Sequence, residues 1–226
     1  MLEITYLGHS AVVLDDGAHR LAIDPFITGN PLAPARPGLR ADDIRVNAIA
    51  VTHGHADHVG DTVAIAKRTG ATVFCAWEVH EYLQEQGVRA TEPGNAGGRI
   101  DAPRGFVAFV QAFHSSSFEG RYMGQPMGAV VRMGGRTVYH CGDTALFSDM
   151  RLIGEVYRPD VACIPVGDRF TMGPELATRA AEFIGAGVAI PIHYKTFGLL
   201  AQSCRGFSPR GVRVQELAPG ASLRLE

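Results

Sequence analysis

Apolar positions in the first half of the chain form short runs that alternate with polar and glycine-containing segments. Residues 2–8 and 10–24 carry strand-forming side chains, and Asp16-Gly17 inside the second segment is typical of a hairpin turn. The apolar run at 46–52 has the length of a buried strand. Helical spacing and a further apolar run then predict a helix at 59–70, a strand at 71–77 and a helix at 78–87.

The second half of the chain repeats this alternation. Strands are predicted, in chain order, at 105–114, at 128–143 as two strands around a Gly134-Gly135 turn, at 160–166 and at 188–194. An amphipathic helix is predicted over 173–187, with Pro174 near its start. Because strands with helices between them occur in both halves, the sequence predicts an α/β layered fold with mixed sheets.

Composition and charge limit the class of protein. The chain has 226 residues, and with no repeat or linker it is expected to form a single domain over residues 1–226. Hydrophobic residues make up 46% and charged residues 19%, which is the balance of a globular protein. The net charge of -2 gives no general attraction to nucleic acid or to anionic lipid.

The sequence also indicates where the protein works and what it binds. No apolar stretch is long enough to cross a bilayer, and the N-terminus lacks the pattern of a secretory signal. The cysteines are scattered, with no C-x-x-C pair. We therefore expect a cytoplasmic protein with reduced thiols and a small-molecule substrate, without nucleic acid or membrane partners, and self-association stays open.

Side chains that can bind metal follow four separate predicted strands. The strand at 46–52 is followed by an H-x-H-x-D-H sequence at 53–58, and three later strands are followed by His114, Asp143 and His193. Ligand sites in α/β sheets collect at the carboxyl ends of the strands, where loops place polar groups on a rigid base. We therefore expect these five histidines and two aspartates to meet in the folded chain.

The number and type of these groups indicate what they hold. One catalytic zinc takes about three protein ligands plus water. Seven groups instead match two metal ions roughly 3.5–4 Å apart that share a bridging carboxylate and a hydroxide. Nitrogen and oxygen donors suit zinc, and also manganese, iron or nickel. No cysteine lies in the cluster, which argues against a closed, thiolate-rich structural zinc site.

These motifs together carry a resemblance to a known family. H-x-H-x-D-H at 53–58 is the signature of the metallo-β-lactamase superfamily. The sequences that narrow the match are YLGHS at 6–10, IDPF at 23–26, CGDT at 141–144, IPVGDRFTMGPELA at 164–177 and PIHY at 191–194. Over nearly its whole length the chain resembles the UPF0173 group of metal-dependent hydrolases, a branch related to ascorbate-6-phosphate lactonases. The resemblance implies a four-layer αβ/βα sandwich in which helices flank two mixed sheets, with the metals at the rim between the sheets.

The resemblance also implies how two divalent metal ions are shared. The first ion is expected on three histidines, His53, His55 and His114. The second ion is expected on one aspartate and two histidines, Asp57, His58 and His193. Asp143 would bridge the two ions, and His9 would lie near the site, where it touches substrate or donates a proton. Asp57, Asp143 and His9 are therefore the candidate catalytic residues.

The function that follows is a metal-dependent hydrolase. Two cations beside one water lower its pKa toward about 7, so that a metal-bound hydroxide attacks an ester, lactone or phosphodiester bond. One alternative is a di-iron oxidoreductase on the same scaffold, although such relatives usually carry Glu at the position of His55 and an attached flavin-binding domain. The other is a nucleic-acid-processing metallo-nuclease, which the resemblance associates with a second domain and a basic groove.

Four other polar residues each have two possible roles. Asp24 could orient a histidine or cap a turn, and Asp143 could be the N-cap of a helix at 145–150 instead of a ligand. Asp168 and Thr171 could line the pocket or cap the helix at 173–187. Three further histidines are expected to be structural or exposed, namely His19, His80 and His140.

The walls of the pocket are expected from the loops 26–40, 115–127 and 195–208. Just past His193, Tyr194 and Lys195 could contact an anionic substrate or lie at the surface. Four residues could form an apolar lining, namely Phe118, Tyr122, Met123 and Phe170. The serines at 115–117 could bind a polar group or satisfy the backbone of their own loop.

Overall fold

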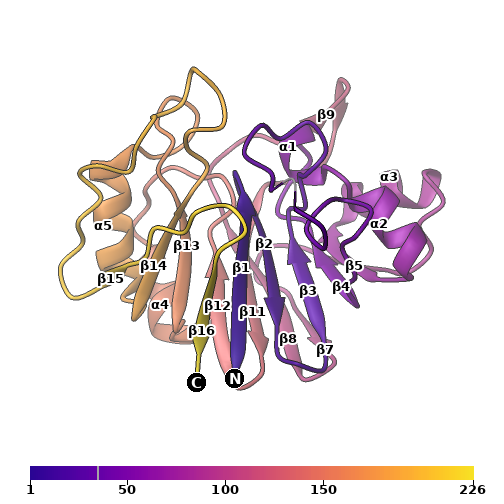
Figure 1. The fold of residues 1–226 in the computed structure, drawn as a ribbon, viewed down its shortest axis with the longest axis horizontal. Helices are drawn as coiled ribbons and strands as arrows, with labels where there is room; N and C mark the ends of the chain where they lie inside the picture. Colours follow the sequence, from indigo (N-terminus) through magenta and orange to yellow (C-terminus); the bar gives the residue numbers. More distant parts are fainter. Residues whose placement is uncertain (35) are drawn as a thin grey trace.

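The computed structural model describes residues 1–34 and 36–226, which form two seven-stranded sheets and a two-stranded ribbon (Figure 1). The first sheet has the order β16-β1-β2-β3-β4-β5-β6. Its strands are β1 (Leu2–Gly8), β2 (Ala11–Asp15), β3 (Arg20–Ile23), β4 (Ala48–Ala50), β5 (Thr72–Ala76), β6 (Thr91–Gly94) and β16 (Ser222–Leu225). Neighbours from β16 to β3 are antiparallel and those from β3 to β6 are parallel, so the sheet is mixed.

The second sheet has the order β15-β14-β13-β12-β11-β8-β7 and is mixed in the same way. Its strands are β7 (Arg99–Ala102), β8 (Gly105–Gln111), β11 (Met127–Met133), β12 (Arg136–His140), β13 (Val161–Pro165), β14 (Val188–Ile192) and β15 (Arg213–Val214). The ribbon consists of β9 (Ser117–Phe118) and β10 (Arg121–Tyr122).

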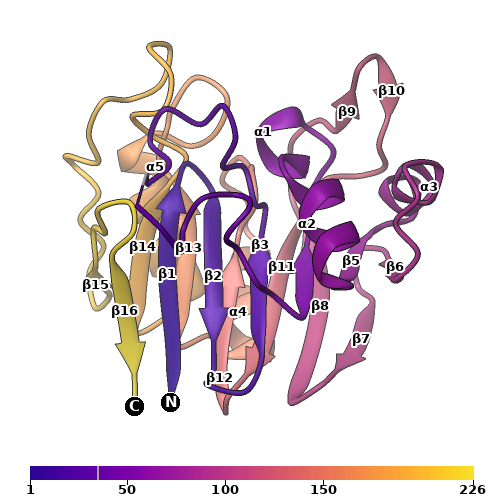
Figure 2. The ribbon, with the colours of Figure 1, turned by 45° about the vertical axis from the view of Figure 1, so that its right-hand side comes forward.

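The helices divide between the two sheets (Figure 2). Those beside the first sheet are α1 (Ala56–Val59), α2 (Thr62–Thr69) and α3 (Trp77–Glu85). Those beside the second sheet are α4 (Met150–Tyr157) and α5 (Pro174–Ile184). Pro174 begins α5, where its missing N–H costs nothing. In the described part of the chain, no helix combines the length and apolarity needed to cross a bilayer.

The alternation of side chains along the strands explains the layers. In β8, Val107 and Phe109 belong to the apolar core that includes both sheets, whereas Ala108 and Val110 belong to the core under α4 and α5. Successive side chains of a strand point to opposite faces, so a strand covered on both sides is apolar throughout. The predicted α/β sandwich with two mixed sheets is thereby confirmed, while the expectation of a single domain over residues 1–226 stays a prediction.

One predicted helix is wrong. Of the predicted helix at 145–150, residues 145–149 are not helical, and α4 begins only at Met150, after Asp149. The backbone before α4 is bonded to another loop, because Phe113 N–H donates to Thr144 Oγ1 and Ala145 N–H donates to the carbonyl oxygen of Phe113. These bonds hold the segment in an irregular conformation next to the loop that contains His114, so it does not form a helical turn.

The polar segments that follow β1, β4, β8, β12 and β14 lie at one rim of the sandwich. The two termini lie at the lower end of Figure 1, and α1, which follows β4, lies at the upper end. Direct contacts confirm that the rim joins both sheets: His193 N–H, after β14, donates to the carbonyl oxygen of His9, after β1, at 2.8 Å. The fold therefore places the ends of strands from both sheets at one site.

Candidate metal centre

The H-x-H-x-D-H sequence occupies the loop after β4 and the single turn of α1. His53 lies in the loop and is fully buried, and His55 immediately precedes α1. Asp57 and His58 lie on α1, where His58 is fully buried and the Asp57 side chain is 28% exposed. A short helix after a buried strand therefore brings four metal-binding side chains into one small volume.

The glycine inside this motif is required by a close contact. A Cβ atom on Gly54 would lie 2.1 Å from Cβ of Met123, which comes from the loop around β9 and β10. The same loop bonds to the motif, since Gly54 N–H donates to Ser116 Oγ at 3.0 Å and that hydroxyl donates to the Met123 carbonyl oxygen at 3.1 Å. Ser116 thus satisfies backbone groups, one of the two roles expected for the serine run.

Three imidazole rings converge on one oxygen of Asp143. Asp143 Oδ2 lies 2.9 Å from His193 Nε2, 3.4 Å from His58 Nε2 and 3.6 Å from His114 Nε2. The Asp143 side chain is 3% exposed, and its other oxygen is buried without a hydrogen-bond partner. Both sheets therefore contribute to a buried carboxylate whose remaining oxygen faces no donor among the described residues.

Asp24 and Thr52 lie beneath the histidines and orient two of them. Asp24 Oδ2 accepts hydrogen bonds from Thr52 Oγ1 at 2.6 Å and from His58 Nδ1 at 2.7 Å, and Oδ1 accepts from Thr52 N–H at 2.8 Å. Since the Thr52 hydroxyl donates to Asp24, it accepts from His53 Nδ1, 3.0 Å away. Both histidines are therefore held by Nδ1, which leaves Nε2 directed into the site.

His9 meets the site from the turn between β1 and β2. Its Nε2 lies 3.0 Å from Asp57 Oδ2, and its Nδ1 lies 2.8 Å from Thr196 Oγ1. Burial lowers the pKa of His9 to about 4, although the hydrogen bond to Asp57 acts in the opposite direction. The ring is therefore neutral at pH 7.

Burial and charge act in opposite directions on the other groups. Burial disfavours charge on His58, but the carboxylates of Asp143 and Asp24 raise its pKa well above the usual value. The pKa of Asp143 is likewise held well below its usual range, because His193 and His58 outweigh the effect of burial. Burial lowers the pKa of His53 well below normal, which keeps that ring neutral. The site thus combines anionic carboxylates with the neutral rings of His9 and His53 and with a His58 ring that the two carboxylates favour in its charged form.

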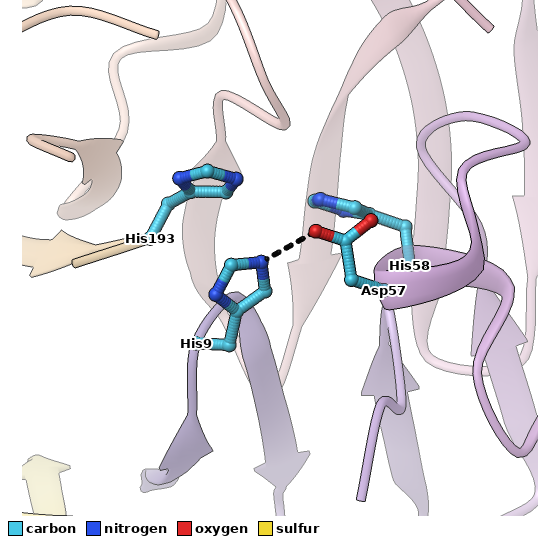
Figure 3. A group of neighbouring side chains, drawn as sticks. All are labelled: His9, Asp57, His58 and His193. Atoms are coloured by element: carbon cyan, nitrogen blue, oxygen red, sulfur yellow. Dashed lines mark hydrogen bonds and ion pairs between the residues drawn. The ribbon is translucent and has the colours of Figure 1, made fainter. Parts of the chain in front are cut away.

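Among the described residues, three groups offer ligand atoms that all lie within 4.8 Å of one another. One group is His53, His55 and His114. A second is His9, Asp57, His58 and His193, drawn in Figure 3, where the four side chains come from both sheets and point toward one another. The third is Asp24, His53 and His58. The first two groups contain every expected ligand except Asp143, which contacts histidines of both.

Comparison with known proteins shows which family carries this fold and these motifs. A family model described as a β-lactamase superfamily domain matches residues 19–194. A UPF0173 metal-dependent hydrolase of Thermus thermophilus is 47% identical over 231 residues, covering 100% of both chains. The chain belongs to the UPF0173 family of metal-dependent hydrolases. A second UPF0173 hydrolase, from Shouchella clausii, is 49% identical over 212 residues, covering 91% of each chain.

A solved structure supports the same assignment for this UPF0173 hydrolase. The metallo hydrolase Igni18 of Ignicoccus hospitalis has a TM-score of 0.88 and 33% sequence identity, with 100% of this chain and 99% of that chain covered. The resemblance inferred from the motifs is therefore confirmed. The protein is a metal-dependent hydrolase of the β-lactamase superfamily.

The residues of this UPF0173 hydrolase fit the metal that its family requires. His58 Nε2 and Asp143 Oδ1 are buried and have no hydrogen-bond partner in the described part of the protein. Buried polar atoms without a partner are costly, so a native site that contains two of them side by side is suited to a group that satisfies them. Imidazole nitrogen and carboxylate oxygen are ligands for divalent metals such as zinc.

Several roles that the sequence left open can now be decided. Asp143 does not cap a helix, because α4 begins after Asp149. Asp168 and Thr171 do not cap α5 either, since its N-cap is Gly173 and no side chain bonds there. Asp168 instead stabilises a tight turn in which its backbone N–H donates to the Met172 carbonyl oxygen.

The residues expected to line the hydrolase pocket differ in where their side chains lie. Tyr194 and Lys195 both donate to Glu216 Oε1, at 2.8 and 2.9 Å. Met123 is fully buried, and Phe118 packs against the core beside Tyr82. Two aromatic residues of the proposed lining are exposed, namely Tyr122 at 65% and Phe170 at 52%.

Of the histidines expected to be structural, two have a clear partner. His140 is fully buried and bonds through Nε2 to the Ser10 carbonyl oxygen at 2.8 Å, which ties the end of β12 to the turn after β1. His80 bonds to Thr91 Oγ1 at 2.7 Å.

The sequence analysis missed two threonines of the site, Thr52 and Thr196, which contact His53 and His9 respectively. Thr52 could have been found because it directly precedes the motif, whereas nothing in the pattern marked Thr196.

Proposed function

We propose that this protein is a binuclear metal-dependent hydrolase that acts on an ester, lactone or phosphodiester bond of a small molecule. The observation that carries the proposal is the convergence of three histidines from two ligand groups on the buried Asp143. A mononuclear site needs about three protein ligands, and this rim offers more than twice that number. A small-molecule substrate and a cytoplasmic location stay predictions.

In this proposal the two ligand groups hold separate ions. His53, His55 and His114 hold the first. Asp57, His58 and His193 hold the second. Asp143 contacts both, and zinc is the favoured metal, with manganese, nickel and iron as alternatives. When bound, such a pair of ions lowers the pKa of a shared water toward about 7 and polarises the oxygen of the bond to be cleaved.

The chain's own residues keep the ligands in the required protonation state. Asp24 accepts the Nδ1 proton of His58 and the hydroxyl proton of Thr52, and Thr52 accepts the Nδ1 proton of His53. Each ring therefore presents an unprotonated Nε2 to a metal once any additional proton has left. Beside the site, the rings of Phe26 and Phe197 lie 5.8 and 5.5 Å from the His9 ring and present apolar surface at the rim.

Two variants test the proposal: one removes a ligand of the first ion, and the other removes the carboxylate that the two ions are proposed to share. We expect His55→Ala and Asp143→Ala to lose bound metal and to lose turnover by more than the roughly 10- to 100-fold that loss of an outer partner costs. Metal content would be measured by elemental analysis, and activity on a panel of lactones, phosphodiesters, aryl esters and thioesters.

His80→Ala is the matched control, because His80 bonds to Thr91 outside the site. It should keep the wild-type metal content of two ions per chain and the wild-type rates. Unchanged metal content and activity in both ligand variants would remove the proposal.

A further inference from the structure

His9 connects the two sheets through its backbone. It follows β1, is fully buried and has a φ angle of 56°, a conformation that non-glycine residues rarely adopt. Its carbonyl oxygen accepts hydrogen bonds from His193 N–H at 2.8 Å and from the Tyr6 hydroxyl at 3.1 Å. These contacts over-determine the position of the turn, so the His9 side chain enters the site from a fixed base.

The two nitrogens of the His9 ring have different partners, and these partners select one tautomer. The Asp57 carboxylate can only accept, so Nε2 carries the proton that is donated to Oδ2 at 3.0 Å. Nδ1 is then an acceptor, and its partner at 2.8 Å is the Thr196 hydroxyl. Thr196 is 5% exposed, and its other acceptor, the Tyr194 carbonyl oxygen, is more distant at 3.3 Å.

The His9 ring also touches the other members of one ligand group. Figure 3 shows it below His193 and joined to Asp57, with His58 beside that aspartate. The centre of the ring lies 4.2 Å from that of His193 and 5.7 Å from that of His58. The three proposed ligands of the second ion therefore surround one buried ring.

We propose that His9 is a positioning residue for the second metal ion, and that Thr196 fixes the His9 tautomer that this role requires. His9 donates its Nε2 proton to one oxygen of Asp57, which turns the other oxygen toward the metal. This proposal rests on the proposed function, because it takes Asp57 as a ligand. It replaces the expectation that His9 donates a proton to the substrate, since that proton is engaged by Asp57.

Two pairs of variants test the proposal. His9→Ala removes the donor, whereas His9→Gln keeps an N–H in a similar place. Thr196→Val removes the hydroxyl with little change of shape, whereas Thr196→Ser keeps it. Stepwise zinc affinities would be measured by competition with a chelator, after circular dichroism has shown that each metal-free variant is folded.

We expect His9→Ala and Thr196→Val to weaken one of the two zinc-binding steps by roughly 10- to 100-fold and to leave the other step unchanged. His9→Gln and Thr196→Ser should remain close to wild type. Equal weakening of both steps, or no weakening of either, would overturn the proposal. If His9→Ala does not fold, the near-isosteric Thr196 pair decides the outcome in the same way.

A second measurement separates this proposal from the proposed function. ¹⁵N NMR of the wild-type protein should show His9 protonated at Nε2 and unprotonated at Nδ1, both without metal and with zinc, and Thr196→Val should shift this tautomer balance. An unprotonated Nε2 in the zinc-loaded protein would make His9 a ligand and contradict the positioning role. A wild-type protein that binds a single zinc ion would instead contradict the binuclear function, while the tautomer result would still decide the role of His9.

Discussion

At the residue scale, one buried carboxylate orients two of the proposed metal ligands. Asp24 is fully buried and has a φ angle of 47°, a conformation that non-glycine residues rarely adopt. It accepts directly from His58 and, through the Thr52 hydroxyl, determines the tautomer of His53. A carboxylate beneath a ligating histidine fixes the orientation of the ring and makes it a better donor. Asp24 therefore orients one proposed ligand of each ion, His58 directly and His53 through Thr52.

Asp24→Asn tests this dependence. An asparagine has one acceptor oxygen and one amide donor, so at least one of the groups that now donate to Asp24 would lose its partner. We expect metal affinity to fall roughly 10- to 100-fold, and the free energy of unfolding of the metal-free protein to fall by about 1–3 kcal/mol. Chelator competition and urea unfolding would measure the two effects.

Asp42→Asn is the control for that experiment, because Asp42 is exposed and, among the described residues, bonds to a side chain through its backbone carbonyl oxygen alone. It should leave both quantities unchanged. A normal metal affinity in Asp24→Asn would show that the orientation of His58 and His53 does not depend on this carboxylate.

At the element scale, α4 depends on a glycine that helix propensity would disfavour. A Cβ atom on Gly154 would lie 2.2 Å from the carbonyl oxygen of Ile184, at the end of α5. The glycine thus permits the two helices to approach closely, while Met150 and Ile153 pack into the core under the second sheet. Close packing has outweighed the cost of about 1 kcal/mol that glycine carries inside a helix.

Gly154→Ala should therefore destabilise the protein although alanine favours helices. The added methyl group must push α4 away from α5, and we expect a loss of about 1–3 kcal/mol in the free energy of unfolding. Gly198→Ala, where a Cβ atom would meet nothing within 4 Å, should stay within about 0.5 kcal/mol of wild type. Denaturant unfolding of both variants would measure this, and a stabilised Gly154→Ala would contradict the close contact.

Burial explains which elements could be predicted from the sequence. Strands such as β13 and β14 are buried throughout, so their continuous apolar runs were visible. The strands β6 and β7 were missed, because polar side chains such as Glu92 and Arg99 are exposed and leave no apolar pattern. The terminal strand β16 pairs with β1 from the other end of the chain, a partner that no local pattern indicates. The helix predicted at 145–150 was placed too early in the chain, because the hydrogen bonds between that segment and Phe113 leave no local pattern.

At the scale of the whole molecule, the two halves of the chain contribute different parts of the site. The first half supplies the H-x-H-x-D-H motif with His9 and Asp24, and the second supplies His114, Asp143 and His193. The sequence could predict this gathering because each group follows an apolar strand, and such strand ends meet at one edge. It could not predict the Thr196 contact, which depends on the path of a loop after β14.

The most direct test of this account is a crystal structure of the zinc-loaded protein with anomalous difference maps. We expect two peaks about 3.5–4 Å apart, one within bonding distance of His53, His55 and His114 and the other of Asp57, His58 and His193. Asp143 should contact both, and His9 should remain on Asp57. A single peak, or no peak between these groups, would contradict the binuclear centre.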